Sequence, residues 1–193
     1  MKIGLIVEGK SDGETIKKLV EKIYAGARRR SKPGIVSRRL AQGNLLKPNK
    51  IRGVVEQMLE EHHPEINKII ICLDCECTAE KEKQPSVSKA AKTLRQLRLQ
   101  PEPRYCLVVH AIEGWLASDP AALKEYFGKE IKLDWDPVKD CRPKDRLRAT
   151  FAKEGKIFTN TEHNPRLAEL VHIKTLSKRN PSFAHFQKLV ESS

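Results

Sequence analysis

The sequence is poor in aromatic side chains and contains no long apolar run. Phe, Trp and Tyr make up 5% of the 193 residues, too few for an extended platform on which nucleic-acid bases could stack. No segment approaches the roughly 20 apolar residues of a membrane-spanning helix. The first residues also lack the apolar stretch and cleavage site of a secretory signal peptide. We therefore expect a cytoplasmic protein with no membrane partner.

Cysteine is scarce as well, and the five cysteines are an odd number. This fits a reducing compartment better than a disulfide framework. Cys72 and Cys75 have the spacing of a redox motif, and together with Cys77 and Cys141 they could in principle bind zinc. Zinc ligands usually come as two separated pairs, and the sequence has no second pair. We expect the thiols to pack as small apolar side chains instead.

Positive charge is what the sequence has in excess. Lys and Arg total 37 against 25 Asp and Glu, a net charge of +12. This balance favours a polyanionic partner, DNA or RNA above all, over a merely solubilising surface. Arg28, Arg29 and Arg30 end the first expected helix, where the helix dipole also favours cations. The residues expected to contact nucleic acid are Arg38, Arg39, Lys47, Lys50, Arg52, Arg142, Lys144 and Arg146.

Apolar strands alternate with amphipathic helices over residues 1–110. The strands are expected at 2–7, 34–41, 67–74 and 104–110, and the helices at 11–30, from Pro48 onward and after Pro85. Continuous apolar strands separated by helices indicate a sheet with helices on both faces. We predict an α/β core with a mostly parallel four-stranded sheet.

Beyond residue 110 the pattern is helical. Asp119, Asn164 and Asn180 each precede a proline, the arrangement of an N-cap followed by the first helical residue. The last helix has an apolar stripe that runs from Phe183 to Val190. We expect residues 111–193 to be a helical extension packed on the core.

Acidic side chains follow two of the expected strands. Glu8 follows the first, while Asp74 and Glu76 end the third and should point to the same side of an extended chain. Ligands of parallel sheets bind at the carboxyl ends of the strands. Clustered carboxylates repel one another unless a cation neutralises them, and oxygen ligands suit Mg²⁺ or Mn²⁺. From spacing alone, a metal site and purely local roles remain equally open.

Two neighbouring acids have local explanations. Asp12 lies in the first turn of a helix, where the dipole stabilises an acid, and Glu14 has capping-box spacing from Ser11.

Lys10 is the basic residue nearest to the acids, and we predict that it contacts phosphate. His110, at the end of the fourth strand, could be an auxiliary base, although a structural role is the stronger alternative.

The motifs "IVEGKSD" and "IIICLDCE" together resemble the TOPRIM domain, the metal-binding fold of primases, topoisomerases and OLD-family nucleases. Glu8 matches the family's glutamate after the first strand, and Asp74 matches the first aspartate of its Asp-x-Asp motif. Glu76 replaces the second aspartate. Asp12 fits the "E-G-x-x-D" form that also occurs in the family.

A further stretch, "HAIEGWLASDPAAL", resembles the "I-E-x-W-L-x-x-D" signature of standalone TOPRIM-like proteins related to the OLD nucleases. Glu113 and Asp119 match its acids. The resemblance implies a TOPRIM-like Rossmannoid three-layer fold. It also implies that Glu8, Asp74 and Glu76 hold Mg²⁺ or Mn²⁺, that Glu8 is a ligand or a general acid/base, and that Glu113 completes a second metal position. Asp12 and Asp119 are possible auxiliary groups.

The activity that the resemblance leaves for this chain is that of a nuclease. Topoisomerases need a tyrosine-bearing domain and primases a zinc domain, and we expect neither in 193 residues. Hydrolysis of a phosphodiester needs only metal ions and water. The alternative is a non-catalytic TOPRIM-like subunit that binds nucleic acid and works with an ATPase. No "GxxxxGK[ST]" motif is present, so that ATPase would be supplied in trans.

Overall fold

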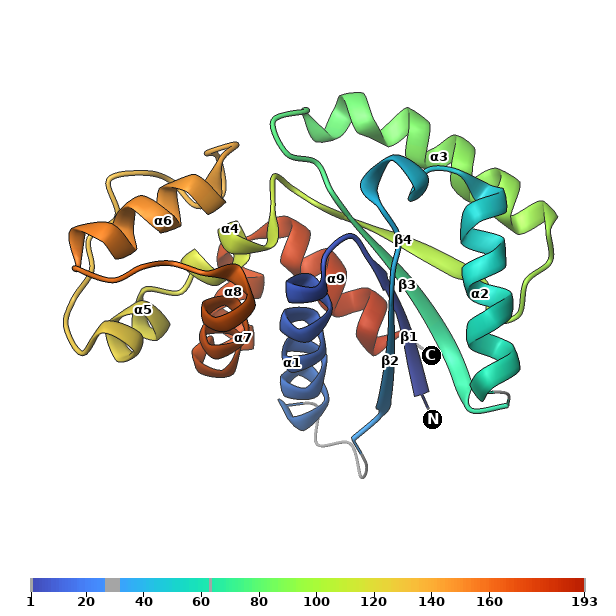
Figure 1. Cartoon of the computed structure of the whole chain (residues 1–193), viewed down its shortest axis with the longest axis horizontal. Helices are drawn as coiled ribbons and strands as arrows, with labels where there is room; N and C mark the ends of the chain where they lie inside the picture. Colours follow the sequence, from blue (N-terminus) through green and yellow to red (C-terminus); the bar gives the residue numbers. More distant parts are fainter. Residues whose placement is uncertain (1, 27–31, 63, 193) are drawn as a thin grey trace.

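The computed structural model describes residues 2–26, 32–62 and 64–192 (Figure 1). The predicted basic cluster Arg28–Arg30 lies outside these residues. In chain order the elements are β1 (Lys2–Val7), α1 (Lys10–Gly26), β2 (Gly34–Arg39), a 3₁₀ turn η1 (Gln42–Asn44), α2 (Pro48–His62), β3 (Ile66–Asp74), α3 (Glu80–Gln96) and β4 (Pro103–Val108). The helices α4 (Ile112–Ala117), α5 (Pro120–Phe127), α6 (Pro143–Lys153), α7 (Asn160–Leu170), α8 (Ile173–Arg179) and α9 (Pro181–Glu191) follow.

The four strands form one sheet in the order β2-β1-β3-β4, and every pair is parallel. The chain therefore has the predicted α/β fold, a three-layer Rossmann-like arrangement. Because β1 and β3 are neighbours, the residues that follow them meet at one edge of the sheet. This edge is where parallel sheets bind ligands.

Side chains from successive strand residues enter two different apolar layers. In β3, Ile70 and Cys72 belong to the cluster that contains α1 and the C-terminal helices, whereas Ile69, Ile71 and Leu73 belong to the cluster under α2 and α3. Figure 1 shows α2 and α3 on the side of the sheet opposite α1. Cys75 lies in the second cluster and Cys72 in the first, so the two thiols of the "Cys-x-x-Cys" spacing face opposite layers.

The C-terminal helices pack directly on the sheet core. Helix α9 contacts β4, and both α7 and α9 contact α1. Trp115 is fully buried, and its ring centroid lies 5.3 Å from those of Phe183 and Phe186 in α9. Its indole Nε1 donates to Ser182 Oγ at 2.7 Å. The predicted apolar stripe of the last helix is confirmed, since Phe183, Phe186 and Val190 are fully buried.

Replacement of Ser182 by alanine should lower the free energy of unfolding by about 1–3 kcal/mol, because it leaves the buried indole N–H of Trp115 without an acceptor. Urea unfolding followed by circular dichroism measures the loss. Ser88 on α3 is exposed and offers the control, Ser88→Ala, which should shift stability by less than about 0.5 kcal/mol. Equal effects of the two substitutions would show that the Trp115 hydrogen bond contributes nothing.

Three predicted helix starts are confirmed and three are wrong. Helix α2 begins at Pro48, as expected. Asp119 caps α5 and Asn180 caps α9 through side-chain oxygens that accept backbone N–H groups. Helix α1 begins at Lys10, so Ser11 forms no capping box and donates to the Asn160 carbonyl at 2.7 Å instead.

Helices α3 and α7 each begin several residues before the proline that was expected to start them. Pro85 and Pro165 lie inside these helices, where each lacks one backbone hydrogen bond. Both helices persist because buried side chains anchor them to the core, among them Val87 in α3 and Leu167 in α7.

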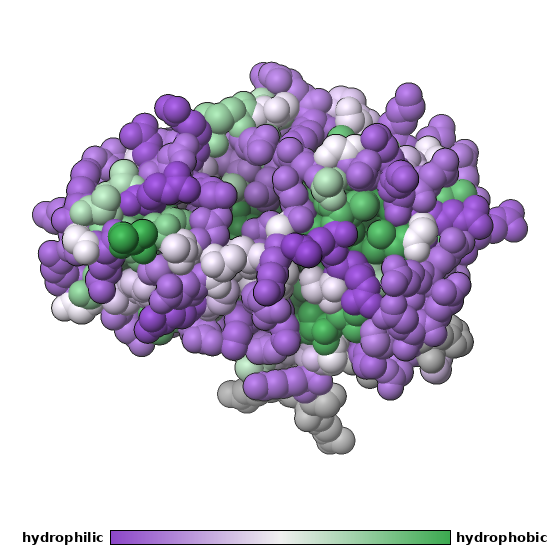
Figure 2. Space-filling model, in the orientation of Figure 1, coloured by the Kyte–Doolittle hydropathy of each residue, from purple (hydrophilic) through white to green (hydrophobic). Residues whose placement is uncertain are grey.

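Most of the surface shown in Figure 2 is hydrophilic. Its hydrophobic residues gather mainly in the half of this face that holds β3, β4 and α2 in Figure 1. Within the described parts of the chain, no helix is both long and apolar enough to cross a membrane.

Candidate functional site

A cleft of about 790 Å³ opens at the carboxyl ends of β1 and β3. Its walls come from the β1–α1 turn, the loop after β3, the start of α4, the segment that leads into α6, and the start of α7. The acidic residues that line it are Glu8, Asp12, Asp74, Glu76, Glu113 and Asp145, and the basic ones are Lys10, Arg142 and Lys144. The sequence therefore predicted most of the acids that the fold brings together.

The acids at the base of the cleft raise one another's pKa. Burial, followed by the nearby carboxylates of Asp12 and Glu113, raises the pKa of Asp74 well above its ordinary value. Burial and then the charges of Asp12 and Glu76 raise the pKa of Glu8. Such groups bind a proton or a cation more readily than isolated carboxylates do.

Glu113 is held in place by two asparagines that the sequence analysis missed. Its side chain is 4% exposed, and its Oε1 accepts from Asn160 Nδ2 at 3.2 Å and from Asn164 Nδ2 at 2.9 Å. Burial raises the pKa of Glu113, against the effect of the Asn164 hydrogen bond. The sequence predicts Asn164 to be a helix cap. Its hydrogen bond to Glu113 joins residues 51 positions apart, so only the structure shows that it holds this acid.

The β1–α1 turn is fixed by Asp12 itself. Gly9 N donates to Asp12 Oδ2 at 2.8 Å, and a Cβ on Gly9 would lie only 2.8 Å from the same oxygen. Burial raises the pKa of Asp12, while the Gly9 hydrogen bond and then the charge of Lys144 oppose this rise. Asp12 therefore combines the predicted local role with a position on the cleft.

Glu76 lies in a turn beyond the end of β3, so the alternation of side chains along a strand does not explain its position on the cleft. Strand β3 ends at Asp74, and Glu76 has a left-handed backbone with φ 51°. His110 has φ 64°, its carbonyl accepts from Glu76 N at 2.7 Å, and its Nδ1 donates to the Glu76 carbonyl at 2.8 Å. His110 thus positions the Glu76 backbone, in agreement with the structural alternative, and it does not itself line the cleft.

A disulfide joins Cys77 to Cys141 at the mouth of the cleft. The expectation that all cysteines serve as buried packing is wrong for this pair, and it holds for Cys72, Cys75 and Cys106. The fold brings the loop after β3 beside the segment before α6. The two cysteines are 64 residues apart in the sequence, so their pairing could not be predicted from neighbouring residues. The bond links two segments of the cleft wall.

The basic residues fall into two groups. Lys144 acts on several of the acids, because its positive charge lowers the pKa of Glu8, Asp12 and Glu113. Lys83 of α3, which the sequence analysis missed, donates to the Asp74 carbonyl. Away from the cleft, Arg38 pairs with Glu61, Arg52 with Glu56 and Arg146 with Asp140. Arg39, Lys47 and Lys50 are exposed, and they too do not line the cleft.

Asp119 lies apart from the other acids. Its Oδ1 accepts from Ala121 N at 3.0 Å and its Oδ2 accepts from His172 N at 2.7 Å. It therefore fastens α5 to the start of α8, and the structure does not bring it to the cleft.

The cleft offers a hydrated Mg²⁺ or Mn²⁺ the right kind of donor, oxygen. Among the described residues, no three His, Cys, Asp or Glu side chains form a ready-made metal cluster. Mg²⁺ does not require one, since it usually keeps several waters and binds through one or two carboxylates plus phosphate oxygens. Asp74 and Glu8, whose pKa values are raised partly by neighbouring carboxylates, fit such a site.

The fold and the cleft define a three-layer α/β protein with an acidic site at the carboxyl edge of a parallel sheet. Residues 7–191 match the family described as Domain of unknown function (DUF4276), and the chain belongs to this family. The match spans both the sheet and the C-terminal helices. Searches of curated proteins and of solved structures gave no match.

Proposed function

We propose that the protein is a TOPRIM-like, Mg²⁺- or Mn²⁺-dependent nuclease that cleaves phosphodiester bonds in its acidic cleft. The observation that carries the proposal is the meeting of Glu8, Asp74, Glu76 and Glu113 at the carboxyl edge of the sheet in a chain of net charge +12. The positive net charge of the protein would attract a nucleic acid, and the acids of the cleft would bind the divalent cation that contacts its phosphates.

The side chains divide the work by position. Asp74 and Glu8, with Glu76 or Glu113, would hold the cation, which when bound supplies Lewis-acid activation of water and of the phosphate. In the alternative role, with the cation held by the other acids, Glu8 would hold a proton for the leaving oxygen, and its exposure and raised pKa suit it to that role. Lys10 and Lys144 would bind the phosphate oxygens from the rim of the cleft.

The test is cleavage of plasmid DNA, single-stranded DNA and structured RNA by the purified chain with Mg²⁺, Mn²⁺ or EDTA. We expect cleavage of at least one substrate that EDTA abolishes. Glu8→Gln should lower the rate at least about 100-fold, the effect of removing a charged group that acts on the transition state. Glu14, exposed on α1 and outside the cleft, provides the matched control Glu14→Gln, which should leave the rate unchanged.

Nucleic-acid binding, measured by fluorescence anisotropy at several salt concentrations, separates the remaining outcomes. Glu8→Gln removes a negative charge and should bind at least as tightly as the wild type. Cleavage that survives Glu8→Gln would refute the proposed site. Binding without any cleavage would refute the nuclease and assign the chain to the alternative, a non-catalytic subunit that an ATPase completes in trans.

A further inference from the structure

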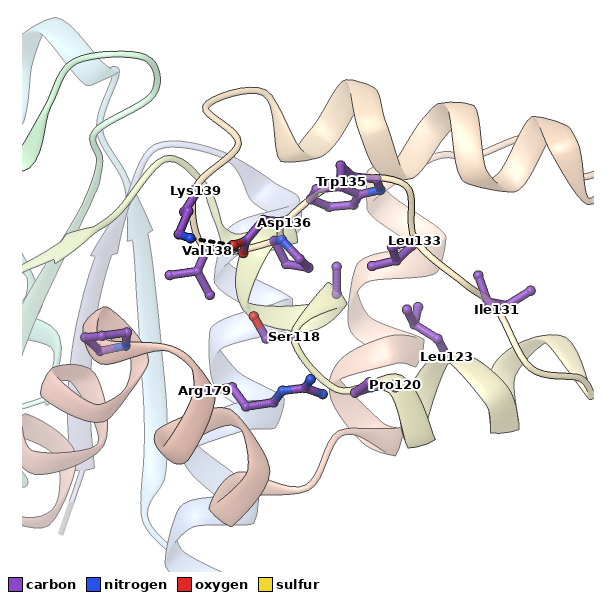
Figure 3. Close-up of a pocket in the computed structure, with 13 residues that line it drawn as sticks. Ser118, Pro120, Leu123, Ile131, Leu133, Trp135, Asp136, Val138, Lys139 and Arg179 are labelled. Atoms are coloured by element: carbon purple, nitrogen blue, oxygen red, sulfur yellow. Dashed lines mark hydrogen bonds and ion pairs between the residues drawn. The ribbon is translucent and has the colours of Figure 1, made fainter.

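A second cavity, of about 530 Å³, lies at the C-terminal end of α4 (Figure 3). Its size falls within the range of small-molecule pockets, about 300–1,000 Å³. It is bounded by the end of α4, the start of α5, residues 131–139, the end of α8 and the start of α9. The apolar residues that line it are Ala117, Pro120, Leu123, Ile131, Leu133, Trp135, Pro137, Val138 and Pro181.

The charged groups around this cavity leave one positive charge uncompensated. Lys139 pairs with Asp136 at 3.4 Å, so these two charges offset each other. Arg179 is exposed at the cavity, and no acidic side chain of the described residues forms an ion pair with it. In Figure 3, Arg179 and Trp135 lie on opposite sides of the cavity, with Ser118 between them.

Arg179 is the group of the walls that favours a ligand accepting hydrogen bonds. Ser118 already donates to the Gly114 carbonyl at 2.7 Å. A guanidinium presents a planar fork of donors that matches a carboxylate in a bidentate contact.

We infer that this cavity binds a small amphipathic carboxylate, with its apolar body against Leu123, Leu133 and Trp135 and its carboxylate on Arg179. Nothing in the proposed nuclease uses this cavity, because its lining and that of the acidic cleft share no residue. The ligand class follows from a mainly apolar, open cavity with a single unpaired guanidinium at its edge.

Isothermal titration calorimetry with the full chain tests this inference, with hexanoate, octanoate and decanoate as probes and 1-octanol as the uncharged comparison. We expect saturable binding of octanoate that is at least 10-fold tighter than that of 1-octanol. Arg179→Gln should weaken octanoate binding by 10-fold or more and leave 1-octanol unchanged. Lys178, exposed on the same helix and not part of the cavity wall, supplies the matched control.

The control Lys178→Gln should bind octanoate like the wild type. Equal losses in the two variants would refute specific recognition by Arg179, because the helix charge alone would then explain binding. Equal affinity for octanoate and 1-octanol, or no binding of any probe, would overturn the inference. Glu8→Gln should bind octanoate normally, and a loss there would place the ligand in the acidic cleft instead.

Discussion

Replacing Asp74 with asparagine should stabilise the folded protein at neutral pH while it lowers metal-dependent cleavage at least about 100-fold. The carboxylate lies at the base of the cleft among other acids, and burial is the main cause of its raised pKa. Asp74 is half-buried on the cleft, so removing its charge relieves repulsion from the neighbouring carboxylates, a gain of about 1 kcal/mol where water screens the charges. At about 2–4 °C per kcal/mol, the melting temperature should rise by roughly 2–4 °C.

The pH dependence of this gain has a definite sign. The pKa of Asp74 is higher in the folded than in the unfolded chain, so the folded state holds its proton over a wider pH range. The destabilising effect is absent below the unfolded pKa, grows between the two values, and is complete above the folded pKa. The difference in melting temperature between variant and wild type should therefore shrink as the pH falls from neutral.

Differential scanning calorimetry between pH 4 and pH 8 checks both statements, without and with added Mg²⁺. Asp134→Asn makes the same chemical change at an exposed ion pair with Lys153, 2.7 Å long, and should give no stabilisation. Mg²⁺ should stabilise the wild type and not Asp74→Asn. A variant that is less stable than the wild type at neutral pH would show that Asp74 is a satisfied structural carboxylate.

Loss of the Cys77–Cys141 disulfide should have the other large effect. The bond spans 64 residues, and closing a loop of that length removes unfolded-state entropy equivalent to about 4 kcal/mol in the chain-entropy treatment. We expect Cys77→Ser, Cys141→Ser and the double substitution to lower the free energy of unfolding by a similar amount. Intact-mass measurement of oxidised protein should show the wild type about 2 Da lighter than its reduced form, because a disulfide lacks two hydrogens.

Dithiothreitol provides the control for this prediction. It should lower the melting temperature of the wild type to that of the double variant and leave the double variant unchanged. Equal shifts of both proteins would contradict a stabilising disulfide. Octanoate binding should survive reduction, because neither cysteine lines the second cavity.

The sheet could be predicted because its signal is local. The apolar run of β3 and its position in a strand–helix alternation require nothing beyond neighbouring residues. The starts of α3 and α7 could not be placed correctly, because proline usually marks the first helical turn and tertiary packing overrides that preference at Pro85 and Pro165.

The acids of the cleft could also be predicted, since they directly follow strands that end at the same edge. The features that position them could not. The left-handed turn at Glu76 depends on reciprocal hydrogen bonds with His110, 34 residues away. The position of Glu113 depends on hydrogen bonds from asparagines 47 and 51 residues away. Lys144, in the first turn of α6, comes near the acids because this end of α6 lines the cleft.

Gly114 lets one segment of the chain, the segment before α6, border both cavities. A Cβ at this position would lie 2.7 Å from the Pro137 carbonyl oxygen, so only glycine lets the segment before α6 lie directly on α4. Pro137 and Val138 of this segment line one cavity, while Arg142 and Lys144 line the other. If a ligand in one cavity shifted this segment, it would change the affinity of the other cavity, and thermodynamic reciprocity would require the same factor in both directions.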